Sequence, residues 1–221
     1  MHFILSLDTA VAGASVCLSD GATVKSLKRH EAQNESAAWI HAAIQELLQE
    51  HSLSVIKLAA VAVSAGPGSY TGLRIGMATA KGLCYATGVP LISINTLQMM
   101  AAAAGEHNGL LCPMIDARRM EVFTALYSKD LQEVQPAQAL ILDETSFAET
   151  LDAVPVLFFG NGSAKFRPLV QHPNASFKTI AADASHIATL ANNALIQKKF
   201  VNLAYSEPFY GKDFFSPGVK H

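Results

Sequence analysis

An α/β fold of two similar lobes is predicted by three features of the sequence. Short apolar segments alternate with longer amphipathic ones, which is typical of strands alternating with helices. The order of three strands, helix, strand, glycine-containing loop and helix occurs twice along the chain. The 221 residues, half of them hydrophobic, are also enough to bury a substantial core.

The strands of the first lobe follow from apolar runs between turn residues. They are predicted at residues 3–8, 13–19, 23–28, 58–64 and 91–94. Asp20-Gly21 is a strong hairpin turn between the second and third of these strands. The run 58–64 has no polar residue until its end, so this strand is expected to be buried on both faces.

The helices of the first lobe have recognisable starts and stops. They are predicted at residues 36–50, 71–87 and 96–104. Asn34 or Ser36 can cap the first helix, and Asn95 or Thr96 can begin the third. Gly88 is the expected end of the second helix.

The second half repeats the order of the first. Strands are predicted at residues 110–115, 121–127, 134–142 and 156–159, and helices at 145–151 and 184–199. A second glycine loop, Gly160-Asn161-Gly162-Ser163, follows the fourth strand. The repeated order predicts the duplicated ribonuclease-H-like fold of actin, sugar kinases and the 70-kDa chaperones. The lobes would cover residues 1–105 and 106–221, and the last helix can pack back on the first lobe.

Composition limits the classes of function. The net charge is −2 and no basic run stands out, which argues against independent binding of nucleic acid. Three cysteines lie in apolar surroundings without a CxxC pair, as expected of buried thiols in a reducing cytoplasm. We expect neither a signal peptide nor a membrane span.

The glycine loop at residues 66–72 is a candidate anion site. It lies between a buried strand and a long helix, and Gly66 and Gly68 would let backbone N–H groups approach a phosphate, with Ser69 beside them. No lysine follows, so the loop is not a Walker-type P-loop. A plain strand-to-helix turn explains the same residues equally well.

Two strand ends carry carboxylates that could face a nucleotide cleft. Asp8 and Thr9 end the first strand, and Asp116 ends the matching strand of the second lobe. Arg118 follows and could pair with an anionic group. The alternative is that Asp116 caps its own turn and that the arginine is solvated.

Small residues recur at four-residue spacing in the helix after the glycine loop. Gly72, Gly76 and Ala80 form this series, flanked by Ile75 and Thr79. Glycine in a helix interior costs roughly 0.5–1 kcal/mol relative to alanine, so close backbone approach must explain it. The approaching partner could be part of this chain or a second protein.

Catalytic signatures are scarce. None of the eight histidines stands three or four residues from another, so no helix presents a two-histidine zinc site. There is no GxSxG elbow and no Cys/His/Asn signature. We therefore expect no bound metal and no catalytic residues.

Four segments resemble one known family. FILSLDTA with ASVCL, AVAVSAGPGSYTGLRIGMATAKGL, VPLISINTLQMMA and IDARRMEVFTALY are similar to the bacterial TsaB family, also called YeaZ. The resemblance covers most of residues 3–127. Members often end in Pro-x-Tyr-Leu-Arg, whereas here Pro208-Phe209-Tyr210 is followed by Gly211-Lys212.

The resemblance implies a non-catalytic protein. TsaB is the inactive paralogue of TsaD, which transfers a threonylcarbamoyl group to N6 of adenosine 37 in tRNAs that read ANN codons. TsaD holds its metal with two histidines four residues apart. The matching positions here are Thr96 and Met100, which make a poor site for such a cation.

The resemblance also implies partners. TsaB pairs with TsaD through helices of the first lobe, can form a homodimer through the same face, helps to recruit the ATPase TsaE, and meets tRNA only through the complex. The expected interface residues are Gly72, Ile75, Gly76, Thr79, Ala80, Trp39, Ile40 and Ile44. Gly76→Leu is then expected to block pairing and leave the monomer folded.

Two enzymatic alternatives remain. One is an ATP-dependent small-molecule kinase of the actin-like superfamily, and the other is a metalloprotease-like protein. Weak binding of ADP or ATP is possible at the cleft or at the interface of the complex. The cleft residues would be Asp8, Thr9, Gly66, Gly68, Ser69, Asp116 and Arg118.

Overall fold

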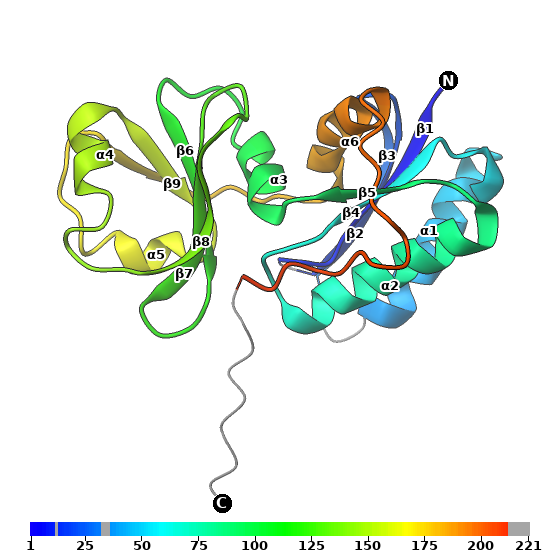
Figure 1. Ribbon diagram of the computed structural model, residues 1–221, viewed down its shortest axis with the longest axis horizontal. Coiled ribbons are helices and arrows are strands. Elements are labelled where there is room, and N and C mark those ends of the chain that lie inside the picture. Colours follow the sequence, from blue (N-terminus) through cyan, green and yellow to red (C-terminus); the bar gives the residue numbers. More distant parts are fainter. Residues whose placement is uncertain (12, 32–35, 212–221) are drawn as a thin grey trace, which may run out of the picture.

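Two five-stranded mixed sheets form the framework of the protein (Figure 1). A computed structural model describes residues 1–11, 13–31 and 36–211. The order of the first sheet is β3-β2-β1-β4-β5, and that of the second is β8-β7-β6-β9-β10 read in the same sense. The identical order shows that the two lobes have the same topology, which confirms the predicted duplicated ribonuclease-H-like fold.

In each lobe the first three strands along the chain pair antiparallel with one another. The fourth and fifth strands run parallel to the first strand of that lobe. The strands of the first sheet are β1 (Phe3–Asp8), β2 (Ala14–Asp20), β3 (Thr23–His30), β4 (Ala60–Ser64) and β5 (Leu91–Ile94). The strands of the second are β6 (Leu110–Asp116), β7 (Glu121–Tyr127), β8 (Glu133–Ile141), β9 (Val156–Phe159) and β10 (Ala175–Lys178).

Helices connect and cover these strands. The α-helices are α1 (Ser36–Glu50), α2 (Tyr70–Thr87), α3 (Thr96–Ala103), α4 (Ala148–Ala153), α5 (Ser163–Phe166) and α6 (Ile187–Ile196). Two short 3-10 helices, η2 (Val55–Lys57) and η3 (Ala184–His186), precede β4 and α6.

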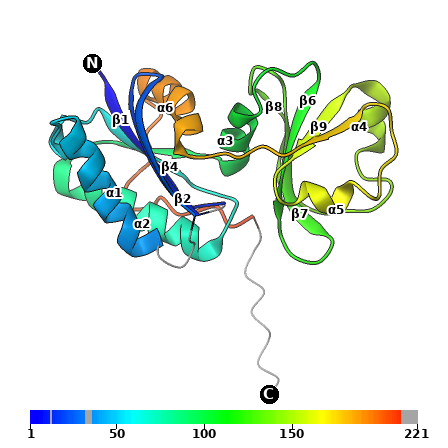
Figure 2. The ribbon, with the colours of Figure 1, turned by 180° about the vertical axis from the view of Figure 1, so that it is seen from behind.

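The molecule has five layers, which Figures 1 and 2 show from opposite sides. Helices α1 and α2 cover the outer face of the first sheet, and α4 and α5 cover the outer face of the second. Helices α3 and α6 lie between the sheets and share one apolar core with both. The two lobes are therefore joined by a continuous core.

The central strands of the first sheet explain this layering. Leu5 and Val61 lie in the core under α1 and α2, whereas Ile4 and Ala62 lie in the core shared with the second sheet. Alternate side chains thus meet opposite layers, so both faces must be apolar. The prediction that the strand near residues 58–64 is buried on both faces is confirmed.

The last helix contacts the first lobe although it follows the second in sequence. Helix α6 lies against β1, β4 and β5. Ile187 and Ala191 on its inner side are buried in the shared core. The chain thus returns from the second sheet, and α6 covers the inner face of the first sheet.

Several element bounds differ from the sequence predictions. Strand β10 and the single-turn helix α5 were not expected, because the sequences ASFK and SAKF mix polar and apolar residues and form no apolar run. Helix α4 begins and ends later than the predicted 145–151, and the predicted helix 184–199 is the 3-10 turn η3 followed by the shorter α6. Gly21 and Ala22, rather than Asp20 and Gly21, form the hairpin loop, since Asp20 pairs with Thr23. The proposed cap Asn34 lies outside the described residues.

Candidate functional site

The glycine loop packs against the turn that follows β1. The backbone N–H of Ser69 donates to the carbonyl of Ala10 over 2.7 Å, and a Cβ on Gly68 would overlap that carbonyl. The Thr9 hydroxyl donates to the carbonyl of Gly72 over 2.6 Å. The structure therefore brings four of the predicted cleft residues close together, namely Asp8, Thr9, Gly68 and Ser69. These contacts are with neighbouring parts of the same chain.

Asp8 is buried and hydrogen-bonded through one carboxylate oxygen. Its side chain is 3% exposed, and Oδ1 accepts hydrogen bonds from the Ser64 hydroxyl (2.5 Å) and the Ala10 amide (3.0 Å). Burial raises the pKa of Asp8 above its ordinary value of 3.8, and these two hydrogen bonds oppose the shift only in part. The carboxylate ties the ends of β1 and β4 together.

Close approach inside the chain explains two glycines of α2. A Cβ on Gly72 would overlap the carbonyl oxygen of Thr9, and a Cβ on Gly76 would overlap the Thr9 hydroxyl. Nothing lies near the position of a Cβ on Gly82, which is exposed. A leucine at Gly76 would therefore require the Thr9 side chain to move, which makes the expectation that Gly76→Leu leaves the monomer folded harder to meet than the sequence suggested.

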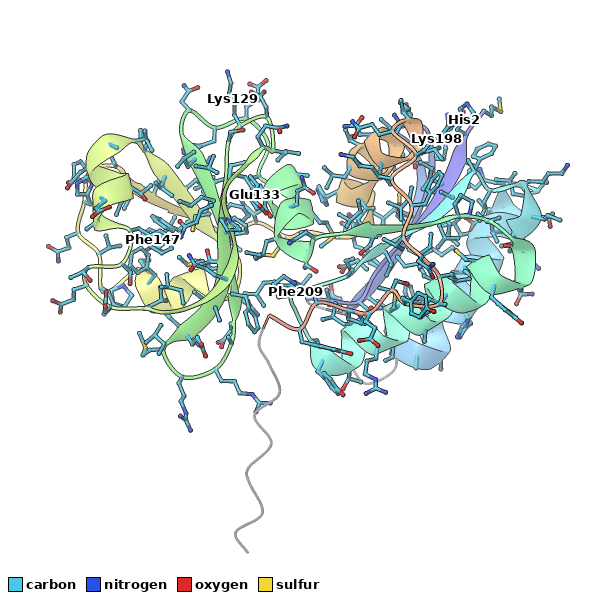
Figure 3. All side chains as sticks on the ribbon, viewed as in Figure 1. His2, Lys129, Glu133, Phe147, Lys198 and Phe209 are labelled. Atoms are coloured by element: carbon cyan, nitrogen blue, oxygen red, sulfur yellow. The ribbon has the colours of Figure 1, made fainter. Side chains whose placement is uncertain are left out.

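A C-terminal segment covers the remaining side of the glycine loop. The Phe209 amide donates to the carbonyl of Ala65 over 2.7 Å, and the Phe209 carbonyl lies where a Cβ on Gly66 would be. The ring of Tyr210 packs on Tyr70 at 5.0 Å between centroids. Figure 3 shows Phe209 between the two lobes. The loop backbone at Gly66 therefore faces its own chain.

Asp116 caps its own turn in the second lobe. Its Oδ1 accepts from the amide of Arg118 and from the Lys165 ammonium, both over 2.6 Å. The hydrogen bond from Lys165 lowers the pKa of Asp116. Arg118 is exposed at the turn with a φ of +71°. Of the two readings left open by the sequence, the turn cap is the one that the geometry favours.

A cavity of about 820 Å³ lies beside this framework. It is lined by the β1–β2 turn, the end of β3, Met100 of α3, the second glycine loop with α5, and the segment from Phe177 to Asp183. None of the seven predicted cleft residues lines it. The second glycine loop was visible in the sequence, whereas the cations Arg167 and Lys178 gave no local signal.

A buried carboxylate that sequence reasoning missed lies at the edge of this cavity. Asp183 Oδ2 accepts from Arg29 Nε (2.7 Å) and Nη2 (2.6 Å), and Oδ1 accepts from Ser185. Burial acts to raise the pKa of Asp183, but the contacts with His186, Ser185 and Arg29 outweigh it and hold the pKa well below its usual range. The spacing of Asp183 and His186, which form a capping box, is the signal that could have found it.

Most of the predicted interface residues lie inside the chain. Gly76, Thr79, Ala80, Ile40 and Ile44 are buried, Gly72 and Ile75 are half-buried, and Trp39 stacks on His30 at 5.3 Å. The outer face of α2 instead presents Tyr70, Thr71, Arg74, Ala78, Gly82, Tyr85 and Ala86. A partner on this side would meet that outer face first.

Thr96 and Met100 of α3 both have structural roles. The buried Thr96 hydroxyl accepts from the Gly66 amide over 3.0 Å. Met100 is 4% exposed, and its methyl group lies where a Cβ on Gly160 would be. These two side chains connect α3 to the two glycine loops.

The described residues contain neither a cluster of metal ligands nor a membrane-spanning helix. Within residues 1–11, 13–31 and 36–211, no three His, Cys, Asp or Glu side chains are grouped as a metal site requires. Over the same part of the chain, every helix is too short or too polar to cross a bilayer.

Comparisons with known proteins agree with this fold. A family profile described as TsaD, tRNA N6-adenosine threonylcarbamoyltransferase, matches residues 29–213. The tRNA threonylcarbamoyladenosine biosynthesis protein TsaB of Bacillus subtilis (strain 168) is 32% identical over 148 residues, which are 65% of this chain and 64% of that protein. TsaB of Escherichia coli (strain K12) is 36% identical over 129 residues, 58% of this chain and 55% of that protein. The matches span less than two thirds of these two relatives.

A solved structure extends the likeness to the whole fold. YeaZ from Pseudomonas aeruginosa superposes with a TM-score of 0.81 at 23% identity, covering 95% of this chain and 100% of that one. Fold and site thus define a two-lobed protein of the actin-like class whose glycine loop is closed by its own chain. The chain belongs to the family that the TsaD profile defines, and within it to the TsaB (YeaZ) group.

Proposed function

We propose that this chain is a non-catalytic subunit required for N6-threonylcarbamoylation of adenosine 37 in tRNAs that read ANN codons. It acts by pairing with TsaD and by supporting recruitment of TsaE, and it meets tRNA through that complex. The names of the relatives, which are biosynthesis proteins of this nucleoside, support the pathway.

The contacts made by Thr96 and Met100 support the proposal that this chain is not catalytic. These residues occupy the positions of the paired metal-binding histidines of TsaD in the family resemblance. The Thr96 hydroxyl is used by the Gly66 amide, and Met100 is packed on Gly160. A thioether and an engaged hydroxyl do not replace two imidazoles as ligands.

The outer face of α2 supports the partner part of the proposal. Ala78, Gly82 and Ala86 leave room for close approach, and Tyr85 beside them is 85% exposed. Interface cores are depleted of charge and enriched in tyrosine, and small residues let two helices approach closely. Between α1 and α2, an adjoining groove is lined by His41, Leu48, Leu83 and their neighbours. A homodimer would use the same face.

Copurification with TsaD tests the pairing. Gly82→Arg and Tyr85→Ala should each weaken the complex, because one places a charge and the other leaves a gap at the interface. Tyr205→Ala is the matched control, since Tyr205 is also 85% exposed but lies outside α2. An interaction that survives both α2 variants, measured by size-exclusion chromatography and calorimetry, would remove this face from the proposal.

Weak binding of ADP or ATP remains a prediction of the same kind. The predicted cleft residues have roles in the fold. We therefore favour the interface of the complex over the cleft as the location of the nucleotide. Calorimetric titration of ADP into the free chain and into its complex with TsaD separates the two locations. Binding heat in the titration of the free chain, without TsaD, would place the nucleotide site in this subunit.

A further inference from the structure

We infer that residues 201–211 form a clasp that holds the two lobes in one relative arrangement. The clasp follows α6 in sequence, runs beside α2 and reaches the space between the lobes, where Figure 3 shows Phe209. The clasp acts within this chain alone, so its existence does not depend on the proposed function.

The first half of the clasp is fixed to the first lobe. The Val201 amide donates to the carbonyl of Leu91 in β5 over 3.0 Å. The side chains of Val201 and Leu203 pack against the core under α1 and α2. The Lys81 ammonium of α2 donates to the carbonyl of Ser206 over 3.1 Å. These contacts hold the clasp on β5 and α2 before it reaches the second lobe.

The next part of the clasp closes against the glycine loop and the start of α2. The Phe209 amide donates to the carbonyl of Ala65 over 2.7 Å, and the ring of Tyr210 packs on Tyr70 with 5.0 Å between centroids. Phe209 itself is 49% exposed, so its attachment depends mainly on its backbone. The amide of Phe209 is therefore the contact to remove in a test.

The end of the clasp meets the second lobe. A Cβ on Gly211 would overlap the ring of Phe123 in β7, so the Gly211 backbone lies directly on this ring. Gly211 also has a φ of +76°, a conformation that glycine adopts without steric cost. Phe123 packs in turn on the core that the two sheets share. Residues 209–211 thus contact the first lobe at one end and the second lobe at the other.

The clasp and the shared core join the lobes at two separate places. Helices α3 and α6 fill the upper part of the space between the sheets, and the clasp crosses below α3 in both views (Figures 1 and 2). Two bodies joined at one place can rotate about it, because a few residues there absorb the change in backbone angles. A second attachment prevents this rotation. Release of the clasp should therefore let the lobes move about the shared core.

Pulsed electron–electron double resonance on the full chain measures the distance between the lobes. One spin label is attached at Ala78→Cys on the exposed face of α2, and the other at Met120→Cys, directly before β7. The native Cys17, Cys84 and Cys112 are buried, so the labels react with the introduced thiols. The labelled chain should give one narrow distribution of distances.

A double variant releases both ends of the clasp. In Phe209→Pro/Gly211→Val, proline has no amide hydrogen to donate to Ala65, and the valine side chain has no space beside Phe123. The distribution of distances should broaden. Tyr205→Ala/Phe209→Ala is the matched control, because it removes two exposed rings from the same segment and keeps the amide and Gly211. Its distribution should stay narrow.

Gly211→Val alone separates loss of the clasp from loss of the fold. It changes the contact with the second lobe and leaves the hydrogen bonds to the first lobe in place. The circular dichroism spectrum and the melting temperature should match those of the unmodified chain while the distribution broadens. A distribution that stays narrow in Gly211→Val, or that is already broad in the unmodified chain, would overturn the inference.

Discussion

Replacing Gly72 by alanine should destabilise the first lobe, whereas the same change at Gly82 should stabilise it. Both glycines lie in α2, but a Cβ on Gly72 would overlap the Thr9 carbonyl and a Cβ on Gly82 would meet nothing within 4 Å. Alanine gains roughly 0.5–1 kcal/mol over glycine in a helix interior, so Gly82→Ala should raise the free energy of unfolding by about that amount.

At Gly72 the steric cost outweighs this gain. Moving the turn away from the new methyl group strains the core by about 1–3 kcal/mol, the usual range for overpacking. It also disturbs the hydrogen bond from the Thr9 hydroxyl to the Gly72 carbonyl, worth about 1 kcal/mol. The net loss should be about 2–3 kcal/mol, which lowers Tm by roughly 4–12 °C in a chain of this size.

Urea unfolding followed by circular dichroism measures both changes on the full chain. The reasoning requires shifts of opposite sign. If Gly72→Ala is as stable as the unmodified chain, or if both variants shift the midpoint equally, then close approach of Thr9 is not the reason for glycine at this position.

Three further outcomes follow from buried groups. Thr96→Val should lower stability by about 1–3 kcal/mol in urea unfolding, because the buried Gly66 amide loses its acceptor; an unchanged midpoint would show that another group satisfies the amide. Asp183→Asn should destabilise by about 1–3 kcal/mol at pH 7. Since the pKa of Asp183 is lowered by folding, its contribution is full above the unfolded value near 3.8 and disappears as pH falls further, so the two unfolding curves should converge in acid and not in base. The three buried cysteines have pKa values raised by burial to about 12, 11 and 12, so a thiol reagent at pH 8 should label them only on unfolding, and rapid labelling of the native chain would contradict their burial.

The framework could be predicted because its signals are local. The apolar runs at β1, β5, β7 and β9 end at turn residues, and their bounds agree with the structure. The end of α2 is equally local, since Gly88 adopts the left-handed conformation there, whereas the cap at Ser69 was not predicted. Strand β10 and helix α5 gave weak signals because their four residues include polar ones and form no apolar run, and β10 owes its form to pairing with β9.

Sequence could not decide what approaches the small residues of α2. A glycine at helical spacing indicates close contact, but the partner atom belongs to Thr9, far away in the sequence and near only in the fold. The ion pair of Arg29 and Asp183 could not be predicted for the same reason, because 154 residues separate the two partners in the sequence. The cavity is likewise assembled from both lobes, so neither its volume nor its charge is visible along the chain.

Reconstituted tRNA modification is the most direct test of the central claim, that this chain supports threonylcarbamoylation without carrying out a chemical step. Purified TsaC, TsaD and TsaE, with ATP, threonine, bicarbonate and unmodified tRNA, are incubated with and without the chain, and nucleosides are measured by mass spectrometry. The account predicts product only when the chain is present, with Asp116→Ala as active as the unmodified chain and Gly82→Arg less active. Equal product without the chain, or loss of product with Asp116→Ala in a folded protein, would contradict it.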